Sequence, residues 1–319
     1  GTDGFTGMAG MHGAYASNMA IQECDLLLAV GTRFSDRVTG NTAAFAPKAR
    51  IVHFDIDPAE LNKNVRADIP VIGDLRQTLP ALIDILKNGS QEDLRTRFRS
   101  WLGDVLSMER AHPLGWKESA EIRPEELISR VRALVDEDAV CVTDVGQHQM
   151  WVAPFYPFCK PRTLLSSGGQ GTMGYGLPAA LGAKAYAGDR PVINFSGDGS
   201  ILMNIQELMT ATEIDKPVIN IILNNNFLGM VRQWQTFFYG ERYSSTDLSL
   251  QPDFAKIAEG FGGTGFVCRT KDEFRSALKE AMACGKTAVL DVRVDRFEDV
   301  LPMVPAGAAI YNMILKSKE

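Results

Sequence analysis

The chain has 319 residues, 45% of them hydrophobic and 23% charged, with 29 glycines, a composition typical of an α/β protein with room for two domains. Its formal net charge of −6 is spread without long runs, which argues against a nucleic-acid-binding surface. No stretch reaches the roughly 18 consecutive apolar residues that a membrane helix needs, and the five cysteines are scattered. We therefore expect a cytoplasmic protein with reduced thiols and with neither nucleic acid nor membrane as a partner.

The first 87 residues show the pattern of part of a Rossmann-like domain. Apolar runs at 25–30 and 50–54 predict two strands. An amphipathic helix follows, with an apolar face formed by Leu75, Leu79, Leu82, Ile83 and Leu86. We expect residues 1–87 to be the carboxyl-terminal part of a domain, and the polar residues 88–121 to be a linker that includes an exposed helix over 91–110.

A second α/β pattern begins at Pro124, because proline is favoured in the first turn of a helix. Six short branched runs predict strands that alternate with amphipathic helices, at 139–143, 163–166, 192–195, 218–223, 265–268 and 288–292. This alternation predicts a six-stranded, mainly parallel sheet covered on both faces. The predicted fold class is α/β with two Rossmann-like parallel-sheet domains, the first incomplete, the second spanning 122–300 and followed by a tail over 301–319.

Two polar motifs follow neighbouring strands of the second domain. The motif Gly-Asp-Gly-Ser at 197–200 ends one apolar run, and 24 residues separate Gly199 from an Asn-Asn pair that ends the next run. A helix is predicted between them from the apolar spacing over 205–212. A right-handed crossover brings both strand ends to one edge of the sheet, so Asp198 and Asn225 should meet where open α/β sheets bind ligands.

The residue types at this edge suit a metal-bound diphosphate. A carboxylate and an amide oxygen are hard ligands for Mg²⁺, which usually completes its coordination with phosphate oxygens and water. Gly197 and Gly199 leave the backbone open to the diphosphate, and Ser200 is expected to open a helix whose amides face it. The alternative is a plain Asp-Gly turn beside an Asn-rich loop, but the joint spacing and the strand context favour the cofactor site.

The first domain carries a second candidate phosphate site. Residues 31–40 follow the first strand directly, which places Arg33 and Arg37 at a sheet edge where phosphate groups commonly bind. Asp55, at the end of the next strand, has the position in which a Rossmann acid meets a ribose hydroxyl. Taken alone, the two arginines could equally form surface ion pairs.

These features resemble the signature of thiamine-diphosphate enzymes, and longer stretches are similar to the catalytic large subunits of acetolactate synthase, also called acetohydroxyacid synthase. The similar stretches are Asp-Val-Gly-Gln-His-Gln-Met at 144–150, Ser-Gly-Gly-Gln-Gly-Thr-Met-Gly-Tyr-Gly-Leu-Pro-Ala-Ala at 167–180, Gly-Met-Val-Arg-Gln-Trp-Gln at 229–235 and Leu-Pro-Met-Val-Pro at 301–305. Residues 230–235 are the most specific to this family. The resemblance implies a thiamine-diphosphate-binding fold for 122–300 and a central FAD-associated domain for 1–87.

By this resemblance the metal is Mg²⁺, held by Asp198, by the side chain of Asn225 and by the main-chain carbonyl of Phe227. Residues expected to contact thiamine diphosphate are Val145, Gly146, Gln147, His148, Gly171, Met173, Gly197, Gly199, Ser200, Gly229 and Met230. Met173 would support the bent cofactor between its two rings, and His148 would lie along the diphosphate. The alternatives are core filling for Met173 and a loop histidine satisfied by its neighbours for His148.

The resemblance also implies FAD, which would take no redox part in the main reaction. Its expected contacts are His12, Gly31, Arg33, Arg37, Asp55 and Asp74. The family usually has Arg-Phe-Asp-Asp-Arg where this chain has Arg-Phe-Ser-Asp-Arg, with Ser35 at the third position. Related fermentative enzymes lack this segment and the FAD, so its presence favours the biosynthetic type.

The implied reaction decarboxylates pyruvate and transfers the two-carbon unit to a second pyruvate or to 2-oxobutyrate, in branched-chain amino acid biosynthesis. Met230 and Trp234 would line the apolar pocket for the acceptor, although ordinary core packing is the alternative for this pair. The intact protein would be a homodimer or tetramer that can bind a small regulatory subunit. The rival interpretations are a pyruvate oxidase, another 2-oxo-acid decarboxylase, or a non-catalytic cofactor-binding module.

Enzymes of this kind use a glutamate on an amino-terminal pyrimidine-binding domain of the neighbouring subunit, and residues 1–319 do not supply it. We therefore expect this chain to be a fragment without a catalytic residue of its own and without carboligase activity when expressed alone. A pyruvate-consumption assay on the isolated chain checks this expectation, and turnover would contradict it.

Overall fold

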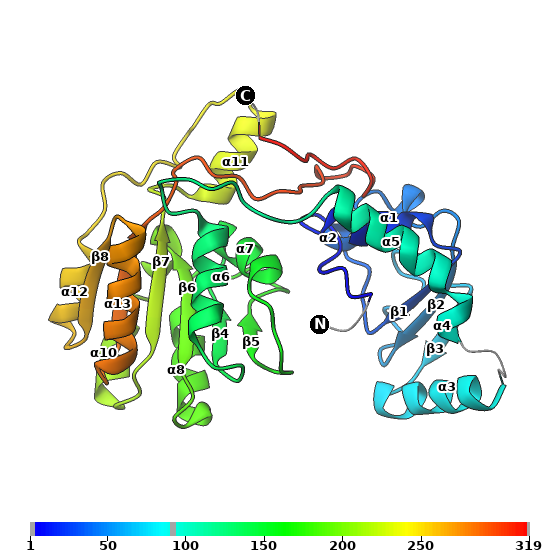
Figure 1. Ribbon diagram of the computed structural model, residues 1–319, viewed down its shortest axis with the longest axis horizontal. Helices are drawn as coiled ribbons and strands as arrows, with labels where there is room; N and C mark the ends of the chain where they lie inside the picture. The colour runs from blue at the N-terminus through cyan, green and yellow to red at the C-terminus, as the bar shows by residue number, and fades with distance from the viewer. Residues whose placement is uncertain (1–3, 90–93, 318–319) are drawn as a thin grey trace. The chain divides into compact units, whose positions relative to one another are not determined.

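The computed structural model describes residues 4–89 and 94–317, and the chain divides into two compact units (Figure 1). Of the described residues, the three-stranded unit comprises those up to Leu114 together with Leu301–Ser317, and the six-stranded unit comprises Gly115–Val300. Both contain parallel sheets and helices, so the predicted α/β class is confirmed. None of the helices in the described ranges is both long and apolar enough to cross a membrane.

The six-stranded unit is built on one parallel sheet with the strand order β5-β4-β6-β7-β9-β8. Its strands are β4 (Val140–Thr143), β5 (Leu164–Ser166), β6 (Val192–Gly197), β7 (Ile219–Asn224), β8 (Thr264–Cys268) and β9 (Ala288–Arg293), which confirms all six predicted strands. The chain passes from β4 outward to β5 and then returns to the other side of β4 with β6. A topological switch point therefore lies between β4 and β6.

Helices cover both faces of this sheet. On one face lie α6 (Pro124–Leu134), α7 (Gln147–Phe155) and α13 (Lys271–Ala283), and on the other lie α8 (Gly176–Ala187), α10 (Glu207–Glu213) and α12 (Phe254–Gly260). Because side chains alternate along a strand, neighbouring residues join different cores, as Ile221 and Ile222 do in β7. Burial on both faces explains the uninterrupted apolar runs in the sequence.

The crossover between β6 and β7 differs from the predicted single helix. It contains the four-residue helix α9 (Asp198–Ile201), and α10 begins only at Glu207. Asn204 lies in the break, where its side-chain amide donates to the carbonyl of Gly174 at 2.8 Å. The expectation that Ser200 opens a helix is wrong, because Ser200 lies inside α9 and its hydroxyl accepts from the main-chain N–H of Gly197 at 3.1 Å.

The three-stranded unit contains a parallel sheet with the order β1-β2-β3. Its elements include α1 (Tyr15–Glu23), β1 (Leu26–Val30), α2 (Asp36–Thr39), the 3₁₀ turn η1 (Thr42–Ala44), β2 (Arg50–Asp55), β3 (Ile69–Ile72) and α3 (Leu75–Gly89). The two predicted strands and the amphipathic helix are confirmed. β3 goes beyond the prediction, since its four residues include Pro70, which weakens a strand pattern.

Segments expected as linker and tail contribute to the three-stranded unit. Most of the expected exposed helix is present as α4 (Leu94–Arg97) and α5 (Arg99–Ala111), while residues 91–93 lie outside the described ranges. The ring of His112, next to α5, lies 3.9 Å from the ring of Tyr15 in α1. In the last segment, the N–H of Val304 donates to the carbonyl of Met11 at 2.7 Å, and Ile310 joins the apolar core.

Gly265 marks a close backbone approach between β8 and α12, because an added methyl group there would collide with the backbone of Ala255. We predict that Gly265→Ala lowers the free energy of unfolding by about 1–3 kcal/mol or more, the usual cost of overpacking. Gly182→Ala in α8 is the matched control, because the added methyl group meets nothing within 4 Å there. That control should stabilise the helix by about 0.5–1 kcal/mol. Urea denaturation followed by circular dichroism measures both, and equal effects would contradict this packing.

Candidate cofactor site

The carboxyl ends of β6 and β7 lie side by side at one edge of the six-stranded sheet. The strands are parallel, and Gly197 of β6 pairs with Leu223 of β7. Asp198 and Asn225 therefore leave the sheet at the same edge, and together with Phe227 they line one cavity. Only 2% of Asp198 and 6% of Asn225 is exposed, so a ligand of these side chains would be largely shielded from water.

The same cavity is lined by all the residues predicted to contact thiamine diphosphate. They come from the β4–α7 junction, the loop before α8, the β6–α9 turn and the start of α11 (Gly229–Phe238). The residues are Val145, Gly146, Gln147, His148, Gly171, Met173, Gly197, Gly199, Ser200, Gly229 and Met230. Segments distant in the sequence thus converge beside the switch point, where ligands of open α/β sheets bind.

Asp144 holds two of these segments together. Its carboxylate accepts hydrogen bonds from the main-chain N–H groups of Val145 at 2.8 Å and Gly174 at 2.9 Å. The side chain is fully buried, and burial raises the pKa of this carboxyl. Asp144 thereby fixes the turn that carries Gly171 and Met173 next to the end of β4. It was not predicted as a site residue, although it begins the motif at 144–150.

Two glycines are required by close packing at the cavity wall. A methyl group at Gly199 would lie 2.8 Å from Leu228 and 3.8 Å from the methyl group of Met173. A methyl group at Gly229 would collide with the side-chain oxygen of Gln147. Met173 therefore lies against the turn that follows β6, in contact with the part of the cavity where the diphosphate is predicted.

Asp198 is a buried carboxylate whose environment favours a cation. Burial raises its pKa to about 7, a hydrogen bond from Gln251 opposes this rise, and the charge of Asp291 adds to it. A neighbouring cation would offset the cost of keeping the group ionised. Together with the amide oxygen of Asn225 and the carbonyl of Phe227, the donor set consists of hard oxygens, so the residues present fit Mg²⁺.

Gln251 is a site residue that the sequence analysis missed. Its Nε2 donates to Asp198 Oδ2 at 2.9 Å, and its Oε1 accepts from Asn224 Nδ2 at 2.6 Å. It lies 27 residues after Asn224 in a loop, and no local pattern marks it. Over residues 4–89 and 94–317 no cluster of three or more His, Cys, Asp or Glu side chains could hold a metal, and the predicted ligand set contains only one such side chain.

His148 presents a buried ring to the same cavity. Burial lowers its pKa to about 3, opposed by a hydrogen bond with the main-chain carbonyl of Asp144. Its Nε2 has no hydrogen-bond partner among the described residues. A buried ring nitrogen without a partner fits a phosphate group, whose negative charge would favour the protonated ring.

Three of the predicted FAD residues lie at the carboxyl edge of the three-stranded sheet. Gly31 follows β1, Asp55 ends β2, and Asp74 comes after β3. The N–H of Gly31 donates to the carbonyl of Phe54 at 2.8 Å, and the N–H of Gly73 donates to the carbonyl of Asp55 at 3.0 Å. These bonds bring the three predicted residues to one edge, as the parallel order requires.

His12 and Arg37 come together in another part of the same unit. The N–H of Met11 donates to the carbonyl of Arg37 at 2.7 Å. Burial lowers the pKa of His12 to about 4, and the charge of Arg37 makes a smaller contribution in the same direction. Arg37 forms an exposed ion pair with Asp36 at 2.9 Å, and Arg33 lies in the loop between β1 and α2.

A second hollow adjoins the first, because Met230 and Val231 line both. Most of its lining surface is apolar. The residues that line it are Met230, Val231, Trp234, Gln235, Tyr239, Arg242 and Ser244. The ring of Trp234 packs edge-on against Phe238, with ring centroids 5.8 Å apart. The predicted pair Met230 and Trp234 therefore faces one hollow from α11.

Comparison with known proteins identifies the family. Residues 144–292 match the family described as "Thiamine pyrophosphate enzyme, C-terminal TPP binding domain", and residues 2–82 match "Thiamine pyrophosphate enzyme, central domain". The chain belongs to the thiamine pyrophosphate enzymes. Thiamine pyrophosphate is the cofactor named thiamine diphosphate above, so the family match agrees with the cofactor predicted from the motifs.

Within this family the chain is similar to large subunits of acetolactate synthase. It is 44% identical over 315 residues to a probable acetolactate synthase large subunit of Methanocaldococcus jannaschii, covering 97% of this chain and 52% of the relative. It is 43% identical over 319 residues to the Haemophilus influenzae large subunit, covering 99% and 55%. It is 42% identical over 317 residues to the isozyme 3 large subunit of Escherichia coli K12, covering 98% and 55%. The chain therefore spans about half the length of these curated relatives.

We predict that the ring of His148 stays neutral from pH 8 down to pH 5 in the ligand-free chain. The pKa is lowered by folding, so the unfolded chain takes up the proton first, and this residue reduces stability as the pH falls below about 6.5. NMR titration of the four histidines, with His148→Gln to assign the signal, measures the pKa directly. A His148 midpoint near 6.5 would contradict the burial of the ring.

Proposed function

We propose that the chain is part of an acetolactate synthase large subunit, a transferase that decarboxylates pyruvate and joins the two-carbon unit to a second pyruvate or to 2-oxobutyrate. The observation that carries this proposal is the convergence of the predicted cofactor residues on one cavity, next to the hollow of Met230 and Trp234. The names of the relatives support the same reaction. Its products would serve branched-chain amino acid biosynthesis.

In this proposal the cavity holds thiamine diphosphate together with Mg²⁺. Asp198, the side-chain oxygen of Asn225 and the carbonyl of Phe227 bind the ion, and the glycine-rich wall admits the diphosphate. The bound cofactor supplies the electron sink for decarboxylation. The chain's own residues bind and orient it: Met173 supports it from the turn before α8, and His148 faces its phosphate groups.

The hollow of Met230 and Trp234 is proposed to receive the acceptor. Its apolar lining distinguishes substrates by how much surface they bury, and one methylene group in such a pocket is worth about 1–3 kcal/mol. This difference is the one that separates 2-oxobutyrate from pyruvate. A carboxylate-bearing substrate also suits the single cationic side chain in the lining, Arg242.

FAD and protein partners complete the proposal. FAD would bind the three-stranded unit at its sheet edge and near the hydrogen bond between Met11 and Arg37, through His12, Gly31, Arg33, Arg37, Asp55 and Asp74. We propose 1–87 as the central domain and 122–300 as the cofactor-binding domain, and the family matches to 2–82 and 144–292 fall within these two ranges. The whole protein would bind a small regulatory subunit, because its relatives are named large subunits, and it would itself form a homodimer or tetramer.

We predict that Mg²⁺ and thiamine diphosphate together raise the melting temperature of the chain and that Asp198→Asn abolishes this rise. Ligand at 100 times its dissociation constant stabilises the native state by about 2.7 kcal/mol. Without ligand, the variant should be at least as stable as the wild type at pH 8. Because burial raises the pKa of Asp198 from 3.8 to about 7, its ionisation lowers stability as the pH rises between these two values, and the full cost is present at pH 8. Differential scanning fluorimetry with and without both ligands measures these effects.

Glu125→Gln is the matched control for this experiment. Glu125 is also a buried carboxyl whose pKa is raised by burial to about 7, but it lies in α6 and does not line the cavity. This variant should keep the full ligand-dependent rise. An equal rise in Asp198→Asn would contradict the metal site. For the whole protein, product analysis should find acetolactate, whereas acetyl phosphate or acetaldehyde would contradict the proposed reaction.

A further inference from the structure

A buried chain of three side-chain amides runs from α11 to the proposed metal site. Gln147 Nε2 donates to Gln233 Oε1 at 3.0 Å, and Gln147 Oε1 accepts from Asn225 Nδ2 at 3.0 Å. Gln233 has no exposed surface and is not part of the cavity lining. A residue that a ligand would not touch is thus connected to a proposed metal ligand through one intermediate side chain.

Main-chain groups determine which end of each amide faces its neighbour. A main-chain N–H can only donate and a carbonyl can only accept, so such partners settle amide orientations. Gln233 Oε1 accepts from the N–H of Val300 at 2.8 Å, and Gln233 Nε2 donates to the carbonyl of Val300 at 3.0 Å. Gln147 Nε2 donates to the carbonyl of Glu298 at 3.0 Å. Gln147 must therefore turn its oxygen toward Asn225.

Asn225 is the last amide of this chain. With its Nδ2 facing Gln147, its Oδ1 accepts from the main-chain N–H of Phe227 at 3.0 Å. Asn226 lies between them with φ of +58°, a left-handed conformation that asparagine tolerates and that folds the loop back. The oxygen of Asn225 is therefore directed toward the residue whose carbonyl is the third proposed ligand.

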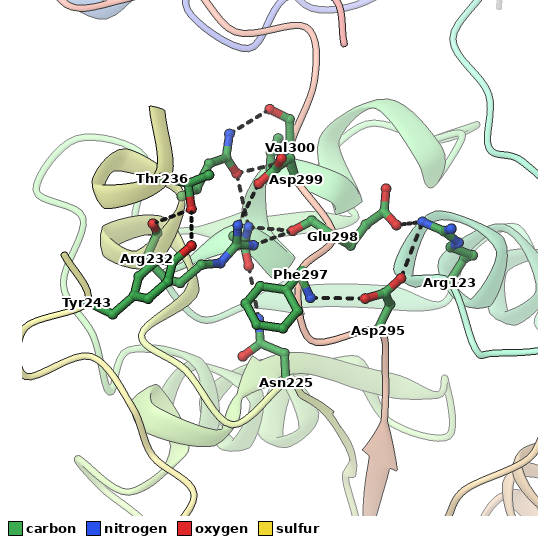
Figure 2. Close-up of polar contacts among 12 residues, drawn as sticks. Arg123, Asn225, Arg232, Thr236, Tyr243, Asp295, Phe297, Glu298, Asp299 and Val300 are labelled. Atoms are coloured by element: carbon green, nitrogen blue, oxygen red, sulfur yellow. Dashed lines mark hydrogen bonds and ion pairs between the residues drawn. The ribbon is translucent and has the colours of Figure 1, made fainter. Parts of the chain in front are cut away.

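A buried ion pair holds the anchoring main chain in place (Figure 2). Arg232 Nη1 donates to Asp299 Oδ1 at 2.7 Å, and Nη2 donates to the carbonyl of Glu298 at 2.6 Å. The side chains of Arg232 and Asp299 are only 1% and 4% exposed. Figure 2 shows this cluster between α11 and the segment 298–300, with Asn225 at its lower end. The pair fixes this segment against α11, since neither charge can be left buried alone.

We propose that Gln233 and Gln147 are positioning residues of the magnesium site: their amides, set by the main chain of Glu298 and Val300, orient Asn225 so that its oxygen binds the ion. This inference rests on the proposed function, because it requires Asn225 to be a ligand. When a residue that hydrogen-bonds to a metal ligand and orients it is removed, the metal affinity typically falls by about 10- to 100-fold.

Gln233→Met tests the proposal, because methionine keeps the volume and removes both functions of the amide. We expect the dissociation constant of Mg²⁺, measured by titration calorimetry on the chain with saturating thiamine diphosphate, to rise about 10-fold or more. Gln149→Met is the matched control. Gln149 lies in α7 two residues after Gln147, and its amide donates to Ser166 at 2.7 Å rather than into the amide chain. Its removal should leave Mg²⁺ affinity unchanged.

Gln233→Glu provides a rescue that a purely structural role would not show. A protonated carboxyl group reproduces both the acceptor for Gln147 and the donor to Val300, and burial favours the protonated form. At pH 6 we expect Mg²⁺ affinity close to that of the wild type at the same pH. At pH 8 the introduced acid ionises more, its second oxygen faces a carbonyl, and affinity should fall below the wild-type value.

The outcomes separate this inference from the proposed function. If the wild-type chain binds no Mg²⁺ with saturating thiamine diphosphate, the proposed metal site itself fails. If the wild type binds Mg²⁺ and Gln233→Met binds it as tightly as Gln149→Met does, the positioning role is overturned. Should Gln233→Met not fold by circular dichroism, Gln233→Glu decides alone: the same affinity relative to the wild type at pH 6 and pH 8 overturns the role.

Discussion

The parallel pairing of β6 with β7 is the constraint on which the proposed site depends. Because the two strands run in the same direction and Gly197 lies opposite Leu223, the residues after both strands must leave the sheet at one edge. An antiparallel arrangement would place Asp198 and Asn225 at opposite ends. Buried apolar residues on both faces of the strands, such as Ile221 on one face and Ile222 on the other, hold this pairing in register.

The cavity edge concentrates polar groups that are costly to bury. Burial raises the pKa of Asp144, which follows β4, of Asp198, which follows β6, and of Asp291, which lies within β9. Hydrogen bonds from the backbone or from a side-chain amide stabilise each buried carboxylate, as the hydrogen bond from Gln251 does for Asp198. The ligand-free protein therefore pays an electrostatic cost at this edge that a divalent cation would reduce. The buried carboxylates therefore favour the binding of a cation at this edge.

The residues that line the cavity could be predicted from the sequence, but the residues that hold them in position could not. Branched runs and glycine-rich turns are local consequences of burial and of tight backbone geometry, and the family motifs mark the residues that face the cavity. Gln233 lies inside the family motif at 230–235, but its role, like that of Gln251, depends on contacts with residues far away in the chain, which no local pattern shows. The break at Asn204 and the strand containing Pro70 likewise depend on tertiary hydrogen bonds and strand pairing.

The position of the cation is the most direct test of the proposed site. Crystals of the chain grown with thiamine diphosphate and Mn²⁺, an ion that accepts the same oxygen ligands, would give an anomalous scattering peak at the metal. We expect this peak at about 2.1 Å from oxygen atoms of Asp198, Asn225 and Phe227, the separation typical of Mg²⁺-type coordination. A peak bound elsewhere, with none at this edge of the sheet, would contradict the assignment of the metal ligands.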